Sequence, residues 1–282
     1  MTIKSILAPL TGAKPEKPVL NTALAIAKRF DAHIDVLHIR TDPRDAIPYL
    51  GEGISGAMIA EIMDRADTEI AEIQSKAHQD FESWRSDAGL PLSQSPGGGA
   101  SCSWQIVTGA ADQTTAIGGR YCDLVVVPGF DDSAENELQF EATVMECGRA
   151  LVLAPPNSPK SLGDRIVIAW DGSAESARAV SAALPFLVTA KSVSIVTISE
   201  SGKTDVDLKA LARYLSWHGV DAETKTVDPG DQSIGEAIMS ATGDADLLVM
   251  GAYSHSRLRE LVFGGATRHV METAELPVLM AH

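Results

Sequence analysis

The sequence predicts an α/β protein made of two tandem doubly wound domains, each with a five-stranded parallel sheet of the Rossmann-like kind. Three observations support this: apolar runs without polar alternation, helical segments between the runs, and one order of runs that occurs twice in 282 residues. Continuous runs of Val, Ile and Leu are typical of strands buried on both faces of a parallel sheet. Their alternation with helices is typical of a doubly wound fold.

The repetition consists of four pairs of segments that keep the same order in the two halves of the chain. The pairs are 4–12 with 164–172, 34–40 with 193–199, 122–130 with 245–253, and 149–155 with 276–282. Between the halves, prolines and small polar residues predict an exposed linker over 155–164. We therefore predict one domain over 1–156 and a second over 163–282.

Helices are expected between the strands. Segments 18–30 and 176–187 are rich in alanine and leucine at helical spacing, and segment 234–242 has the same character. A shorter helix is expected over 205–218. The first half has a longer insertion, in which apolar residues recur every three or four positions and the pattern ends near Ala88. These residues are Met58, Ile62, Ala66, Ile70, Ile73, Ala77, Phe81 and Trp84. One long amphipathic helix is expected there, packed on its own sheet, with a lid or a dimer contact as alternatives.

Composition excludes several classes of protein. With 45% hydrophobic and 22% charged residues the chain has an ordinary globular composition. No run approaches the roughly 18 apolar residues that span a bilayer, and the first residues do not resemble a secretory leader, so we expect a soluble, cytoplasmic protein. A formal net charge of -15 disfavours binding to nucleic acid or to an anionic membrane.

The three cysteines, Cys102, Cys122 and Cys147, have no CxxC spacing. Their odd number and spacing favour buried thiols over a disulfide framework or a zinc site.

The segment 250–271 carries the strongest indication of a binding site. Gly251 follows an apolar run, and the lack of a Cβ there allows a ligand or another backbone to approach closely. Gly264 and Gly265 precede a predicted helix, whose first N–H groups and positive dipole end suit a phosphate. Thr267 offers a hydroxyl donor. Positive charge comes from Arg257, Arg259 and Arg268.

Each of these features also has a purely structural interpretation. The two glycines can form a simple turn, and the arginines can be solvated surface charges. Asp171, at the end of the first strand of the second half, can accept hydrogen bonds from an adenine amine or a ribose hydroxyl. It can equally cap the following helix.

With these motifs the second half is similar to a universal stress protein domain, whose nucleotide signature is G-x2-G-x9-G-[ST]. Because the first half follows the same order, the whole chain resembles a tandem universal stress protein with the adenine nucleotide alpha-hydrolase-like fold. The resemblance implies a stress-response regulator that binds ATP or AMP, with Mg²⁺ or without it, and by position Ala169 and Ile198 flank the adenine. The implied site residues are Ala169, Asp171, Ile198, Met250, Gly251, Ser254, Gly264, Gly265, Ala266 and Thr267.

The chain departs from the family signature in both halves. In the second, Ser254 stands in place of a glycine and Gly265 in place of the Ser or Thr. In the first, Thr11 replaces the aspartate, Pro128 replaces the first motif glycine, and Glu141 aligns near the position of Gly264. A carboxylate repels phosphate, so we predict one binding copy and one degenerate copy.

Known catalytic signatures such as GxxxxGK[ST], GxSxG and HExxH are absent from the sequence, and His255 and His269 are expected as surface or helix-face residues. Binding is therefore favoured over catalysis, with an unidentified regulatory protein as partner. An alternative is a nucleotide-free assembly module, in which the two copies pair as a pseudo-dimer within one chain and further homodimerisation is optional. Slow ATP hydrolysis is a weaker alternative.

Overall fold

The computed structural model describes residues 2–12, 16–42, 44, 56–129, 134–199, 206–253 and 265–282. Strands and helices alternate in the first half, as the sequence predicts. They are β1 (Ser5–Leu10), α1 (Lys17–Phe30), β2 (His33–Arg40), α2 (Gly56–Ala88), β3 (Ser101–Thr108), α3 (Ala111–Gly119), β4 (Leu124–Val127), α4 (Ala134–Glu146) and β5 (Leu151–Leu153).

The second half repeats this alternation with shorter helices. Its elements are β6 (Arg165–Ala169), α5 (Ala174–Leu187), β7 (Ser192–Ile198), α6 (Leu208–Ser216), β8 (Ala222–Val227), α7 (Ile234–Thr242), β9 (Leu247–Gly251), α8 (Gly265–Thr273) and β10 (Val278–Ala281).

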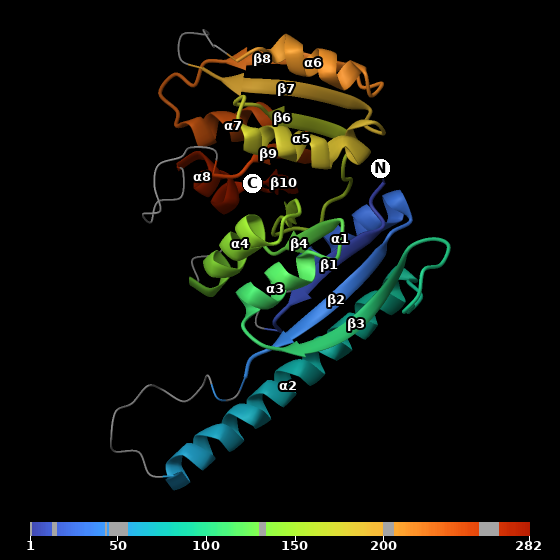
Figure 1. Ribbon diagram of the computed structural model, residues 1–282, viewed down its shortest axis with the longest axis vertical. Coiled ribbons are helices and arrows are strands. Elements are labelled where there is room, and N and C mark those ends of the chain that lie inside the picture. The colour runs from blue at the N-terminus through green and yellow to red at the C-terminus, as the bar shows by residue number, and fades with distance from the viewer. Residues whose placement is uncertain are drawn as a thin grey trace.

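These strands lie in one sheet with the order β3-β2-β1-β4-β5-β10-β9-β6-β7-β8 (Figure 1). Neighbouring strands are parallel within each half. At the centre β5 and β10 pair antiparallel, with Leu153 opposite Val278 and Leu151 opposite Met280. The prediction of an α/β fold with doubly wound parallel halves is confirmed.

The pairing of β5 with β10 has a direct physical reason. Both strands are apolar and buried along their whole length. Left as two separate sheets, the halves would each expose such a strand at an edge, with its N–H and C=O groups unpaired. Because the halves share one sheet, the predicted boundaries at 156 and 163 stay a prediction.

Helices cover both faces of the sheet. Buried side chains of α1, α2, α5 and α6 pack together on one face, and those of α4, α7 and α8 pack on the other, beside α3. Across the central pair, the rings of Phe30 and Phe186 meet edge to face at 4.9 Å between centroids. The two halves are therefore joined by helix packing as well as by strand pairing.

Arg29 forms a polar clamp beside this aromatic contact. Its guanidinium donates to the carbonyl oxygens of Leu162 (3.0 Å), Gly163 (2.8 Å) and Thr189 (3.0 Å), and to Asp164 Oδ1 (3.0 Å). One side chain of the first half thus holds the backbone on which the second half begins.

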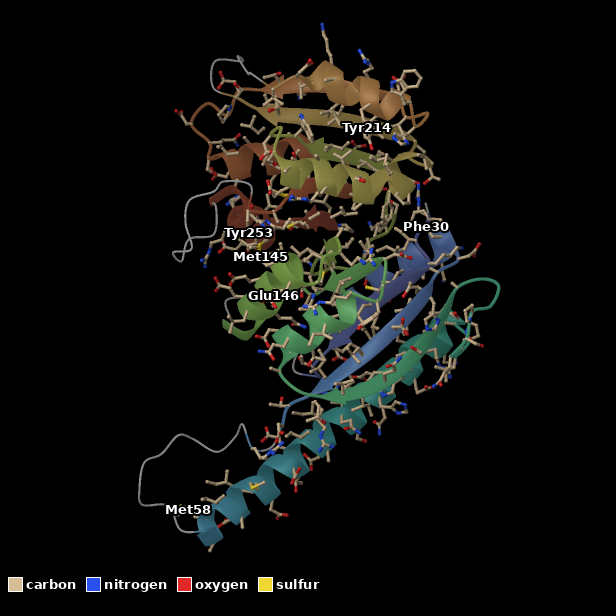
Figure 2. All side chains as sticks on the ribbon, in the orientation of Figure 1. Phe30, Met58, Met145, Glu146, Tyr214 and Tyr253 are labelled. Atoms are coloured by element: carbon tan, nitrogen blue, oxygen red, sulfur yellow. The ribbon has the colours of Figure 1, made fainter. Side chains whose placement is uncertain are left out.

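Helix α2 confirms the predicted long helix, but only part of it packs on the sheet. Its buried residues are Ala77, Phe81 and Trp84, all in the second half of the helix. Met58 is 55% exposed and lies at the far end, which projects beyond the sheet (Figures 1 and 2). Where the helix passes the end of β1, Ile73 lies so close to Gly12 that a Cβ there would overlap it.

The cysteines are free and buried, as predicted. Burial raises the pKa of the Cys122 thiol to about 12 and that of Cys102 to about 11, so both are protonated at neutral pH. Within the part of the chain that the structure describes, no helix combines the length and the apolar character that a membrane span requires.

Candidate functional site

The candidate site of the second half lies where three neighbouring strands end. Strand β6 runs between β7 and β9, and Ala169 on β6 is paired with Val196 and with Met250. Ile198 is the last residue of β7 and Gly251 the last of β9. In an open parallel sheet this is the switch point, where the crevice beyond the strand ends accepts ligands.

Asp171 leads the chain from β6 into α5. Its Oδ1 accepts hydrogen bonds from the backbone N–H of Ser173 (3.0 Å) and from Ser173 Oγ (2.6 Å). Ser173 is the N-cap of α5, because its side chain accepts from the N–H of Ser176. The alternative in which Asp171 itself caps the helix was therefore wrong: the exposed aspartate orients the residue that does.

Gly251 is enclosed by protein backbone. A Cβ on this residue would lie 2.6 Å from the backbone nitrogen of Ser176 and 2.9 Å from the carbonyl carbon of Glu175. A glycine here allows close approach either by a ligand or by another stretch of backbone. The structure shows the second, because the first turn of α5 packs against Gly251. The neighbouring Met250 is 5% exposed, so its side chain belongs to the core.

Replacement of Gly251 by alanine is expected to destabilise the protein by about 1–2 kcal/mol, because α5 must shift to admit the methyl group. Urea unfolding followed by circular dichroism measures the change in the free energy of unfolding. Gly98→Ala is the matched control, since a Cβ there meets nothing within 4 Å. Equal stability of the two variants would show that α5 does not press on Gly251.

The start of α8 supplies the remaining described residues. The helix begins at Gly265, and Ala266 packs against the apolar cluster that also contains Ala169 and Ile198. Thr267 is 6% exposed, so its side chain is turned largely into the protein. Ser254 and Gly264 lie outside the described residues, as do Arg257, Arg259 and His255.

Charges around the described part of the site are mixed. Arg268 Nε donates to Glu272 Oε1 at 2.7 Å, so part of its charge is neutralised within α8. Tyr253 follows β9 and lies 6.5 Å from the Phe140 ring of α4. Burial, followed by the charges of Glu141 and Glu137, raises the pKa of Tyr253. Helix α4 of the first half therefore brings two carboxylates close to this end of β9.

Glu141 does not occupy the position that alignment suggested for it. It was expected near the place of Gly264, before the last helix of its half, but it lies within α4, which already begins at Ala134. The shorter loop of the first half starts this helix earlier, and the carboxylate points to the surface beside the second half.

The first half keeps a hollow at the corresponding strand ends. It has a volume of about 320 Å³ and is lined by Thr11, Ile39, Thr41, Gly109, Ala110, Ala111, Asp112 and Leu138. No lysine or arginine is among these lining residues, and Asp112 adds a negative charge. Thr11 thus follows β1 as Asp171 follows β6. It borders a hollow whose described lining residues include no lysine or arginine.

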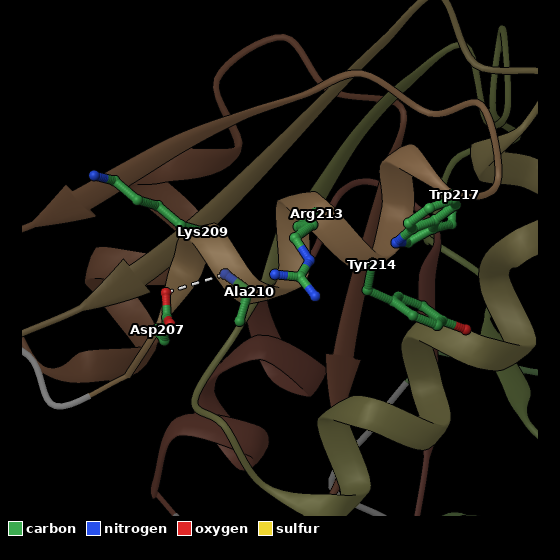
Figure 3. Close-up of a pocket in the computed structure, with 6 residues that line it drawn as sticks. All are labelled: Asp207, Lys209, Ala210, Arg213, Tyr214 and Trp217. Atoms are coloured by element: carbon green, nitrogen blue, oxygen red, sulfur yellow. Dashed lines mark hydrogen bonds between the residues drawn. The ribbon is translucent and has the colours of Figure 1, made fainter.

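A further hollow, of about 500 Å³, lies on α6 and contains none of the predicted site residues (Figure 3). Its lining combines cations with aromatic rings: Lys209 and Arg213 beside Tyr214 and Trp217. Trp217 is 82% exposed. Asp207 caps the helix by accepting from the N–H of Ala210 at 3.0 Å.

Comparison with known proteins finds similarity to one family. Residues 196–282 match the model of the universal stress protein family. Universal stress protein Slr1230 of Synechocystis sp. is 33% identical over 124 residues, which are 41% of this chain and 41% of that relative. The second half of the chain is therefore similar to universal stress proteins. The chain thus aligns with less than half the length of this curated relative.

A solved structure extends the similarity to the whole fold. The crystal structure of a universal stress protein from Archaeoglobus fulgidus superposes with a TM-score of 0.70, at 16% identity, over 99% of this chain and 96% of the other. At that identity the likeness concerns the fold alone.

Ser173 is the residue of the site that the sequence predictions missed. The signal was available, since a serine two positions after Asp171 and directly before a helical segment is a typical N-cap. The carboxylates of Glu137 and Glu141 had no such signal, because only the pairing of β5 with β10 brings α4 beside Tyr253.

Proposed function

We propose that the second half of the chain binds an adenine nucleotide, ATP or AMP, at the ends of β6, β7 and β9. The observation that carries this proposal is the register, which sets Ala169 beside Met250 and brings Asp171, Ile198 and Gly251 to one edge of the sheet. Ala169 and Ile198 offer apolar contacts to the base. The exposed Asp171 offers a carboxylate to the adenosine hydroxyl or amine groups.

The phosphates are proposed to lie toward the start of α8, near Gly265, Ala266 and Thr267, with Ser254 and Gly264 completing the loop. Helix α8 supplies the positive end of a dipole and the N–H groups of its first turn. Because Thr267 is largely buried, backbone groups rather than its hydroxyl are the main phosphate donors in this account. Mg²⁺ would be carried by the phosphates.

The two halves are proposed to be a tandem pair in which only the second binds. In the first half, the described residues that line the hollow beside Thr11 include no cation, and α2 packs onto Gly12 through Ile73. A Cβ built on Gly172, the counterpart of Gly12 in the second half, would meet Val206 at 3.6 Å and no other described residue within 4 Å. Among the described residues, Gly172 is thus less tightly covered than Gly12.

Occupancy is proposed to regulate a partner protein. Val206, beside Gly172, lies directly before α6, whose outer face carries the cationic and aromatic hollow with the exposed Trp217. A ligand held by Asp171 lies close to the segment that begins this helix. The hollow on α6 is therefore our candidate for the partner surface in a stress response (Figure 3).

Thermal unfolding tests nucleotide binding. A ligand that binds only the folded state stabilises it by about 2.7 kcal/mol at 100 times its dissociation constant, so millimolar ATP or AMP is expected to raise the melting temperature by several degrees. Asp171→Ala should lose most of this shift, whereas Thr11→Ala, the matched change in the first half, should keep it. No shift with the unmodified chain, or loss of the shift in Thr11→Ala alone, would contradict the proposal.

Assembly is the second candidate function, and the antiparallel pairing of β5 with β10 favours it. This pairing joins the two halves as a pseudo-dimer inside one chain, without any ligand. Light scattering distinguishes the possibilities: pairing within the chain alone gives the mass of a monomer, whereas a homodimer gives twice that mass.

A further inference from the structure

A second cavity lies in the first half, at the opposite ends of the strands. It has a volume of about 840 Å³, and its walls are the amino-terminal parts of β1, β2 and β3 together with the loop over 94–99. Ligands of open parallel sheets bind at the carboxyl ends, so this cavity belongs to neither nucleotide position. Its lining includes Ser5, His33, Asp35, Ser101 and Ser103.

Strand register brings a serine, a histidine and an aspartate into line on the cavity wall. His33 and Ser101 are direct partners on β2 and β3, and Asp35 lies two residues farther along β2 on the same face. Ser101 Oγ is 2.8 Å from His33 Nδ1. On the other side of the ring, His33 Nε2 is 3.3 Å from Asp35 Oδ1.

The His33 ring and two hydroxyl groups favour the ionised form of the Asp35 carboxylate. The His33 hydrogen bond, followed by that of Ser103, lowers the pKa of Asp35. Ser103 Oγ donates to Oδ1 at 2.8 Å, and Ser5 Oγ donates to Oδ2 at 3.4 Å. An ionised carboxylate only accepts hydrogen bonds, so His33 Nε2 carries the imidazole proton. In the neutral ring Nδ1 is then the acceptor, and the Ser101 hydroxyl can donate to it.

We propose that Ser101 is the nucleophile of an acyl-transfer site, with His33 as its general base and Asp35 as the residue that positions His33. The arrangement has the order of groups of a serine hydrolase, in which a histidine takes the serine proton and a carboxylate faces the other ring nitrogen. The substrate class is a small carboxylic ester. The proposal is independent of nucleotide binding.

The reaction balances with the groups present and water. Ser101 Oγ forms a bond to the ester carbonyl carbon while His33 takes the hydroxyl proton. The bond to the alcohol oxygen then breaks, and His33 returns the proton to release the alcohol. Water adds to the acyl-serine, His33 accepts its proton, and the carboxylic acid leaves as that proton returns to Ser101. Gly97 and Gly99 line the cavity, and their peptide N–H groups would stabilise the oxyanion.

Phosphonylation tests the nucleophile directly. A fluorophosphonate forms a bond from phosphorus to Ser101 Oγ with loss of fluoride, and mass spectrometry of the intact protein and of its peptides locates the adduct. We expect one adduct, on Ser101, formed by the folded protein and not by heat-denatured protein. Ser101→Ala should abolish it, while Ser192→Ala, which removes an exposed serine at the start of β7 in the second half, should leave its rate unchanged.

Two further variants test the base and its positioning residue. His33→Gln should slow labelling by about 100-fold, the usual range for loss of a general base. Asp35→Asn should slow it as well, and Asp35→Glu should restore part of the rate, which a merely structural role of Asp35 would not produce. Absence of labelling, labelling at another residue, or an undiminished rate in His33→Gln with an unchanged melting temperature would overturn the proposal.

Discussion

Replacing Phe81 with alanine is expected to destabilise the protein by about 3–5 kcal/mol, the usual cost of removing a buried phenyl ring. Phe81 is fully buried where α2 meets the sheet, with its ring 4.9 Å from that of Trp104 and 6.0 Å from that of Trp84. Loss of the ring leaves a cavity between helix and strand. Urea unfolding followed by circular dichroism gives the change in the free energy of unfolding.

Met58→Ala is the matched control on the same helix. Its side chain is exposed at the projecting end, so the expected change is within about 0.5 kcal/mol. A large effect of Met58→Ala would mean that the projecting part of α2 is covered in solution, as in the dimer contact that the sequence left open.

Arg29→Ala is expected to cost about 2–3 kcal/mol, because hydrogen bonds from a charged donor to three carbonyl oxygens and a carboxylate are lost together. The Arg29 side chain is partly exposed to solvent, so the expected loss of stability is smaller than for a fully buried ion pair. Asp164 retains Lys191 at 2.8 Å, so the variant does not leave it unpaired.

The control for Arg29 is Arg65→Ala, which breaks an exposed pair with Glu61 on α2. Such surface pairs contribute about 0.5 kcal/mol or less. If both arginine variants lost equally little stability in urea unfolding, the clamp between the halves would be no stronger than a surface ion pair.

The strands that the sequence located best are those buried on both faces. Segments 122–130 and 245–253 contain β4 and β9, because continuous apolar runs mark central strands of a parallel sheet. The third strand of each half, β3 or β8, was expected only because strands and helices alternate. The sequence did not show which residues form it. Both are edge strands with many exposed residues, so they lack a continuous apolar run.

The sequence predicted those site residues that local patterns mark, but not the contacts that tertiary packing creates. Asp171 and Gly251 follow from the rule that parallel strands end at one edge of the sheet, whereas Ile198 was implied only by the family resemblance. The contact between the α5 backbone and Gly251 arises from tertiary packing, which a local sequence pattern does not reveal. The contact between His33 and Ser101 spans 68 positions and arises from strand register, while each residue alone has the appearance of an ordinary polar residue near a strand end.

The adenylate content of the purified protein tests the central proposal, nucleotide binding in the second half, most directly. Protein purified without added nucleotide is soaked in ATP, freed of unbound ligand and heat-denatured, and released adenylate is measured by mass spectrometry. We expect one adenylate per chain, lost in Asp171→Ala and kept in Thr11→Ala. No adenylate from the unmodified chain, or the same amount from Asp171→Ala, would contradict it.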